Sequence, residues 1–164
     1  MTTQLPPAAL YGPAPAARGG TSSPQGTHVR DHRTVSPNLV LFPPLRVEFR
    51  GGTLAAPAAI TANAKAVLEL PPWKGEFTSV RVLLDQAGDI VIDIWKDAYA
   101  NYLPTVADTI TASAKPTISA GTKYESTTLT GWARHFAPGD ILLFNVDSIA
   151  TATWCVVSLT FRAG

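Results

Sequence analysis

The three histidines are the first residues to consider as metal ligands or as a general base. His28 and His32 lie four positions apart, a spacing that would bring both rings to one face of a helix. They fall in a stretch rich in glycine and proline where Asp31 is the nearest carboxylate, so we expect polar contacts with a partner rather than a metal site. His135 stands alone beside Arg134, and no serine has the strand-turn-helix context of a nucleophile elbow. We therefore predict no catalytic residue and no bound metal.

Four aspartates, Asp85, Asp89, Asp93 and Asp97, recur at every fourth position. The surrounding sequence predicts two strands and a turn rather than a helix, so this spacing does not gather them. We expect Asp85 and Asp89 to cap the turn between them, and Asp93 to need a hydrogen-bond partner if it is buried. Paired glycosidase carboxylates or a calcium site are the less favoured alternatives. No phosphate-binding loop or dinucleotide fingerprint is present, so we expect no cofactor and no enzyme activity.

Aromatic side chains offer a different chemistry, because their faces can stack on the apolar surfaces of sugars. The candidates are Trp73, Trp95, Trp132, Trp154, Tyr99, Tyr102 and Tyr124. Packing in a core or an interface is the more common use of such residues, and we favour it here over a sugar-binding platform.

The composition limits the class of protein. The chain has 164 residues, of which 46% are hydrophobic and only 15% charged, well below the charge of an ordinary soluble domain. This predicts a molecule that hides surface in an assembly. A net charge of +1 gives no reason to expect nucleic-acid binding, and no apolar run is long enough for a membrane-spanning helix. The single cysteine, Cys155, excludes an internal disulfide.

The first third of the chain, Met1 to Thr53, differs from the rest. Nine of the fourteen prolines lie at or before Pro57, and they block helix and favour extended backbone. This segment carries five basic and two acidic residues, a net charge of +3, whereas the remainder carries eight basic and ten acidic, a net charge of −2. We predict an extended arm rich in proline, glycine and alanine over residues 1–53 that docks on another protein.

Two kinds of residue in this arm are candidates for partner binding. Arginines would pair with carboxylates of the partner, and the one strongly apolar run would anchor the arm. The arginines are Arg30, Arg33, Arg46 and Arg50, and the apolar run is Leu39, Val40, Leu41 and Phe42.

Strand signals dominate from residue 54 onward. Val80–Leu84 and Ile90–Lys96 flank the glycine-containing turn Asp85–Asp89, which predicts a β-hairpin. Ile141–Asp147 and Trp154–Arg162 alternate apolar and other residues, as strands with one buried face do. Shorter candidate strands are Val47–Phe49, Ala66–Leu70 and Thr127–Leu129. Several short strands without a sustained helical period predict an all-β fold, an antiparallel β-sandwich of jelly-roll-like type over residues 54–164.

One long run of residues resembles a β-rich structural module of tailed-bacteriophage virion proteins. The similarity covers roughly residues 64–161. It is carried by Ile92–Thr111, Ser113–Pro116, Leu129–Trp132, Gly139–Leu142 and Phe144–Ser148. This resemblance implies a virion component that oligomerises, and it implies no catalytic residues.

From these observations we expect a virion structural protein, a capsid decoration, cement or head-fibre protein that docks by its arm. Its expected partners are further copies of itself, with a trimer favoured, and the major capsid protein or another virion protein, but neither nucleic acid nor a membrane. We expect it on the capsid exterior, with the tail or neck as other possible places. The alternative is a tail-fibre or receptor-binding module that recognises a host surface glycan.

Overall fold

The structure is a computed structural model and describes residues 42–164. This part of the chain is almost entirely β-structure, and every strand pair in it is antiparallel. The strands are β1 (Leu45–Arg50), β2 (Lys65–Glu69), β3 (Gly75–Asp97), β4 (Thr117–Ser126), β5 (His135–Phe136), β6 (Ile141–Ala150) and β7 (Trp154–Ala163). Two short 3-10 helices, η1 (Tyr99–Asn101) and η2 (Val106–Asp108), lie between β3 and β4. No helix within residues 42–164 has the length and apolar character needed to cross a membrane.

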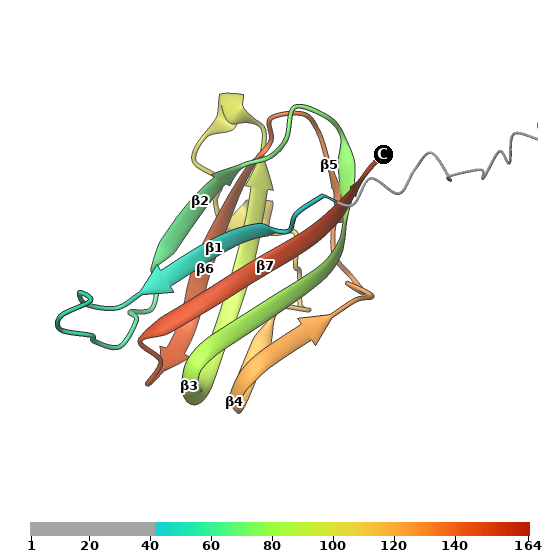
Figure 1. Cartoon of the computed structure of the whole chain (residues 1–164). Coiled ribbons are helices and arrows are strands. Elements are labelled where there is room, and N and C mark those ends of the chain that lie inside the picture. Colours follow the sequence, from blue (N-terminus) through green and yellow to red (C-terminus); the bar gives the residue numbers. More distant parts are fainter. Residues whose placement is uncertain (1–41) are drawn as a thin grey trace, which may run out of the picture. The chain divides into compact units, whose positions relative to one another are not determined.

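The long strand β3 bends and takes part in two layers. Its first half pairs with β7, and its second half pairs with β6. β4 follows β3 around the bend and pairs with both halves. The front layer is therefore β1-β7-β3-β4, and the back layer is β2-β6-β3-β4 (Figure 1). This confirms the predicted all-β antiparallel sandwich, which is nearly closed into a barrel because β1 and β2 lie near each other.

The predicted hairpin at Asp85–Asp89 is wrong, because this segment is continuous strand. β3 pairs with β4 before and after the bend, with Leu83 opposite Lys123 and Gly88 opposite Gly121. The register shifts between these pairs accommodate the bend. A Cβ atom at Gly88 would lie 2.6 Å from the carbonyl oxygen of Ala150, so only glycine lets the bent strand pass this close to β6.

The two aspartates at the bend do not cap a turn of their own, which corrects the second expectation for this segment. The carboxylate of Asp85 accepts hydrogen bonds from the backbone N–H and the hydroxyl of Thr153, at the corner between β6 and β7. Asp89 accepts a bond from the backbone N–H of Ala120 in β4. Both carboxylates therefore fasten neighbouring strands to the bend in β3.

The core lies between the two layers and is built by strand alternation. On β7 the inward residues Cys155, Val157, Leu159 and Phe161 are all buried, as the sequence predicted. Ile90, Ile92 and Ile94 of β3 oppose them from the back layer together with Phe144 of β6. The side chains with no exposed surface include Phe77, Ile90, Ile92, Ile94, Leu142, Leu159 and Val157.

The short candidate strands meet different outcomes. Thr127–Leu129 is not a strand, and β4 occupies the preceding residues Thr117–Ser126. The candidate strand Val47–Phe49 is confirmed within β1 (Leu45–Arg50), which pairs with β7 from Leu45 opposite Leu159 to Arg50 opposite Trp154, although the sequence analysis also placed these residues in the arm. The sheet takes up this segment because Val47 and Phe49 alternate with charged residues and bury their side chains. The folded domain therefore begins before residue 54.

Candidate functional site

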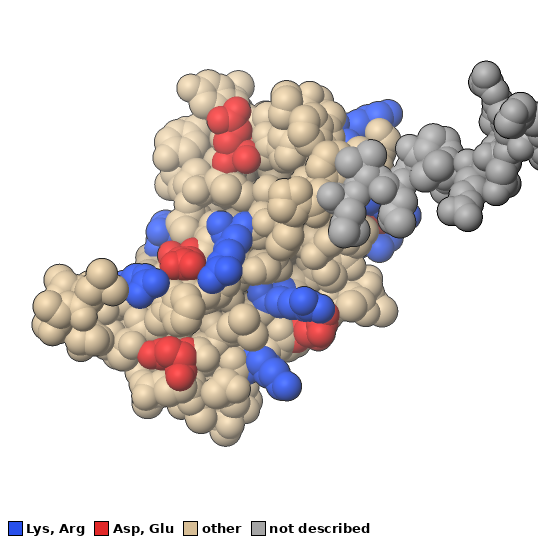
Figure 2. All heavy atoms as spheres, viewed as in Figure 1, with Lys and Arg blue, Asp and Glu red and all other residues tan. Residues whose placement is uncertain are grey.

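The outer side of the front layer is an open face, here called the front face. It consists of the outward side chains of β1, β7, the first half of β3 and the second half of β4. The registers place Arg46, Ser158, Arg81 and Glu125 in one row across the four strands. A second row runs from Glu48 through Val156 and Leu83 to Lys123. Figure 2 shows this side with Lys and Arg side chains spread along it and acidic side chains between them.

Positive charge exceeds negative charge on the front face. Its basic side chains are Arg46, Arg50, Arg81, Lys123 and Arg162, with Arg134 next to it just before β5, and its acidic ones are Glu48, Glu76, Asp85 and Glu125. Each glutamate is already within 3.4 Å of at least one arginine. The pairs of Glu48 and Glu125 are exposed and add little to folding stability, whereas Glu76 is buried. The surplus of arginine and lysine gives this face a net attraction for acidic groups of a partner.

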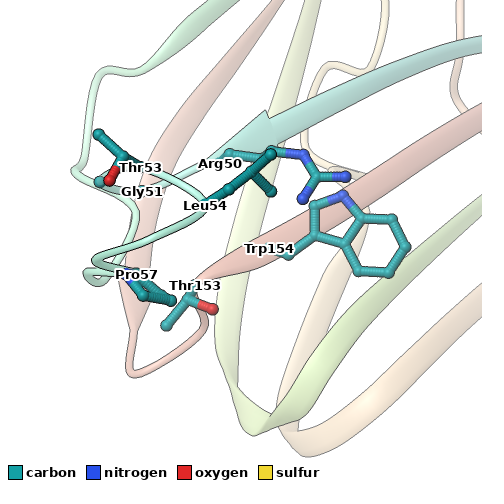
Figure 3. A pocket seen from close by; sticks show the side chains of 8 residues that line it. Arg50, Gly51, Thr53, Leu54, Pro57, Thr153 and Trp154 are labelled. Carbon is teal, nitrogen blue, oxygen red and sulfur yellow. The ribbon is translucent and has the colours of Figure 1, made fainter.

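A hollow of about 110 Å³ lies at the β1 end of the front face. Arg50 lies over the indole of Trp154, with its Cζ atom 5.1 Å from the ring centroid (Figure 3). Thr53, Leu54 and Pro57, from the loop after β1, line the hollow beside this pair. The stacked guanidinium keeps its donors at the surface, which suits a small carboxylate such as an acidic side chain.

At the opposite end of the front face, Glu76 lies between two arginines. Arg134 and Arg162 approach its two carboxylate oxygens to 2.9 and 2.6 Å. The hydrogen bond from Arg162, followed by the charges of both arginines, lowers the pKa of Glu76 from its ordinary value, although desolvation opposes the shift. His135 lines a second hollow together with Glu76 and Arg162, so this histidine lies beside the ion-pair cluster.

A buried polar cluster lies on the outer side of the back layer. Asp93 has no exposed surface, and its Oδ1 accepts hydrogen bonds from the hydroxyls of Thr109 and Thr111, both at 2.6 Å. The Lys115 ammonium lies 3.0 Å from Asp93 Oδ2 and 2.6 Å from Asp147 Oδ2. The predicted need of Asp93 for partners is met, because the segment after β3 returns alongside it and supplies them.

The titration behaviour of this cluster follows from these contacts. Burial acts to raise the pKa of Asp93, but the bonds from Thr109, Thr111 and Lys115 outweigh it and hold that pKa below its ordinary value of 3.8. The bonds to Asp147 and Asp93 raise the pKa of Lys115 above its ordinary value of 10.5. The cluster is therefore charged across the neutral range and clamps residues 109–115 to β3.

The segment between β3 and β4 ends in an apolar tip, defined by Tyr99, Tyr102, Leu103 and Val106. Tyr99 is 74% exposed and Tyr102 59% exposed, and no residue from 98 to 107 is charged. Hydrogen bonds to two aspartates hold the two ends of the tip. Asp97 accepts a hydrogen bond from the backbone N–H of Ala98, and Asp108 closes a capping box with Thr105.

The aromatic candidates divide between packing and exposure. Trp95 and Trp132 are buried, as the packing interpretation predicted, whereas Tyr99 and Tyr102 project from the apolar tip. Trp73 is part-exposed and stacks on Phe42, with ring centroids 5.4 Å apart. The seven aromatics therefore do not form one platform.

The predicted partner-binding residues meet different outcomes. Arg30, Arg33, Leu39, Val40 and Leu41 lie outside the described residues. Arg46 and Arg50 are exposed on β1 and belong to the front face.

Phe42 packs within its own domain, and its role as an anchor on a partner protein stays a prediction. Its ring stacks on Phe161 of the same domain, with centroids 5.1 Å apart, and on Trp73. The apolar core beneath the ring gives this side chain a site within its own chain.

Sequence reasoning missed the front-face residues Arg81, Leu83, Lys123 and Glu125. Arg81 and Leu83 alternate with the buried Val80, Val82 and Leu84, so their outward position could have been derived from the pattern. Lys123 and Glu125 lie on β4, which is too polar to give a strand signal.

Within residues 42–164, no three histidine, cysteine or acidic side chains are grouped so that they could hold a metal ion. Comparisons with protein-family models, with curated proteins and with solved structures found no match. The chemistry of the front face and of the apolar tip is therefore the basis for a functional assignment.

Proposed function

We propose that this chain is a structural protein of a bacteriophage virion, a capsid decoration, cement or head-fibre protein that binds other virion proteins. The sequence similarity over residues 64–161 supports the virion role. The front face is the feature of the structure that favours binding over catalysis. Arginine and lysine outnumber acidic side chains on this face, which extends over β1, β7, β3 and β4. The partner is an acidic surface of the major capsid protein or of another virion protein.

β1 connects the predicted arm with the front face. Its residues fall within the segment 1–53 that the sequence analysis assigned to the arm, and it carries Arg46 and Arg50 outward. A partner that binds the arm thus meets two of the predicted arginines on the sandwich itself. Contact through both parts would add their binding energies and would fix the orientation of the domain on the shell.

Truncation tests this proposal at the arm. Removal of Met1–Pro37 leaves Phe42, β1 and the core intact, so the shortened chain is expected to fold. We expect it to be absent from purified particles, whereas the full chain is incorporated. Normal incorporation of a folded, truncated chain would refute docking by the arm.

Charge reversal tests the proposal at the front face. Arg46→Glu with Arg50→Glu is expected to lower incorporation, because it turns two attractive contacts into repulsive ones. Lys74→Glu together with Lys65→Glu, which changes the net charge equally but at positions outside the front face, is the control. Equal incorporation of both double variants would contradict a role for the front face.

A glycan-binding tail-fibre or receptor-binding module is the second candidate, and the apolar tip favours it. Tyr99 lies in η1 and Tyr102 directly follows it, both with exposed rings, and such rings can stack on sugars. Saturable binding on a glycan array that is lost in Tyr99→Ala and Tyr102→Ala but kept in Tyr124→Phe would support this candidate. Absence of any binding by the full chain would remove it.

A further inference from the structure

Strand β4 leaves a backbone edge open. Among the described residues it forms a ladder with β3 alone, and the backbone hydrogen bonds outside the ladders do not involve residues 122–126. The edges of β1 and β2 differ, because those two strands lie near each other and nearly close the barrel. Figure 1 shows β4 as the outermost strand of its layer, beside β3. An open edge of this kind can pair with another strand.

The regular part of this edge is short and has a defined centre. Ser126, Glu125, Tyr124 and Lys123 pair in unbroken register with Val80 through Leu83 of β3. The ladder becomes irregular between Leu83 and Ile90 of β3, and on β4 Ala120 has a positive φ of 48° opposite this stretch. A partner strand can thus follow β4 over residues 122–126, and Tyr124 is the middle of that segment.

The charges on this segment match those of a second copy in one register. If two β4 strands pair antiparallel about Tyr124, Lys123 of each copy lies opposite Glu125 of the other, on the same face of the sheet. A centre at Lys123 would instead set lysine against lysine, and a centre at Glu125 would set glutamate against glutamate. Charge therefore selects the centre that also uses the whole regular segment.

Neighbours on the front face strengthen this match. Glu125 already binds Arg81, with 2.7 Å between Arg81 Nη2 and Glu125 Oε1. The second copy would add its Lys123 on the other side of the same carboxylate, which gives a row of alternating charges across the contact. Leu83, 49% exposed and next to Lys123 on β3, would lie at the end of this row.

We propose that two copies of this chain associate through their β4 edges, with Tyr124 on the two-fold axis, so that the two front faces join into one continuous sheet. Antiparallel pairing of identical strands is two-fold, so the unit it forms is a dimer and not the trimer expected from the sequence. The proposal goes beyond the virion role and does not depend on it. The dimer would double the basic surface that a partner meets.

Two charge reversals test the register, using the full chain. Lys123→Glu sets glutamate against glutamate twice in its own dimer, and Glu125→Lys sets lysine against lysine twice. We expect each variant alone to weaken the dimer by at least about tenfold in sedimentation velocity. In an equimolar mixture, the first variant supplies an acidic side chain at both positions and the second a basic one. Opposite charges then face each other at both contacts, so dimers are expected to return.

Matched controls separate this contact from a general charge effect. Lys74→Glu and Glu69→Lys make the same net changes at exposed positions outside β4, and both are expected to dimerise like the wild type. Circular dichroism and thermal melting will show whether each variant is folded. A wild-type chain that stays monomeric at high concentration would overturn the proposal, as would a mixture of the two β4 variants that stays monomeric.

Cross-linking gives a second measurement that does not rely on charge. Lys123→Cys and Glu125→Cys face each other across the proposed contact, so their mixture is expected to form a disulfide-linked heterodimer on mild oxidation. Each variant alone would place its cysteines diagonally, too far apart to bond readily. The native Cys155 is buried and does not compete. Equal cross-linking of the single variants and of the mixture, or a trimer by mass, would contradict the two-fold β4 contact. If residues 1–41 of the same chain covered the β4 edge instead, the wild type would stay monomeric.

Discussion

Replacement of Lys115 by methionine probes the buried cluster that holds the segment between β3 and β4. The ammonium of Lys115 lies between Asp93 and Asp147 and is the cation nearest to the fully buried Asp93 carboxylate. Methionine keeps much of the side-chain volume but removes the charge. Asp93 would then keep only its bonds from Thr109, Thr111 and the backbone N–H of Ile94.

The expected cost follows from burial. Removing one partner of a buried ion pair typically destabilises a protein by about 3–5 kcal/mol, because the other charge stays buried without compensation. The Lys115 side chain is 29% exposed, and the two threonine hydroxyls remain, so we expect about 2–3 kcal/mol here. Asp147→Asn is the control: it removes the other, part-exposed contact of Lys115 and is expected to cost about 1 kcal/mol or less.

The pH dependence separates an electrostatic loss from a packing loss. In the wild type the lowered pKa of Asp93 gives stability that is present above 3.8 and is lost as pH falls through the folded-state pKa. The raised pKa of Lys115 gives stability that is present below 10.5 and is lost as pH rises through its folded-state pKa. The contribution of the pair is therefore constant between these limits.

Lys115→Met weakens this dependence for Asp93. Without the ammonium the pKa of that carboxyl rises toward its ordinary value of 3.8, while the bonds from Thr109 and Thr111 still lower it. The loss of unfolding free energy should therefore shrink as pH falls below 3.8, and urea unfolding followed by tryptophan fluorescence should show a smaller loss at about pH 3 than at about pH 7. An equal loss at both values, or a loss no larger than that of Asp147→Asn, would refute the proposed role of the Asp93–Lys115 pair.

Three other expectations can be checked on the purified protein. Gly88→Ala should lower the melting temperature, because its Cβ would lie 2.6 Å from the Ala150 carbonyl oxygen. Gly121→Ala, whose Cβ would have its nearest contact at 3.4 Å, should be tolerated. Equal melting temperatures for the two variants would show that the bend has more room. Burial raises the pKa of Cys155 to about 12, so the thiol should react with a thiol reagent only after unfolding, and rapid labelling of the native protein would contradict this. Phe42→Ala should cost about 1–2 kcal/mol and shift the fluorescence of Trp73, because the ring stacks on Trp73 and Phe161, while an unchanged unfolding curve would mean that the stack contributes nothing.

The alternation of side chains was enough to predict the central strands. In Trp154–Arg162 the apolar residues Cys155, Val157, Leu159 and Phe161 recur at every second position, and such a period is a local property of a strand at a core. In β6 residues 141–146 are all buried, so the apolar run predicted the strand but not that both of its faces are covered there. β4 could not be found in this way, because an edge strand buries little and its sequence is mostly polar or small. The bend in β3 was taken for a hairpin for a related reason: glycine and aspartate occur both in turns and where strands pass closely.

The sequence by itself determined the all-β class, the inward face of β7 and the need of Asp93 for partners, because each depends on residues close together in the chain. Tertiary structure alone decided which groups meet. Lys115 reaches Asp93 and Asp147 only because residues 109–115 return beside β3. Arg46, Arg81 and Glu125 share a row only because β1, β3 and β4 lie in one layer, and pairing between strands distant in sequence is set by packing of the whole domain.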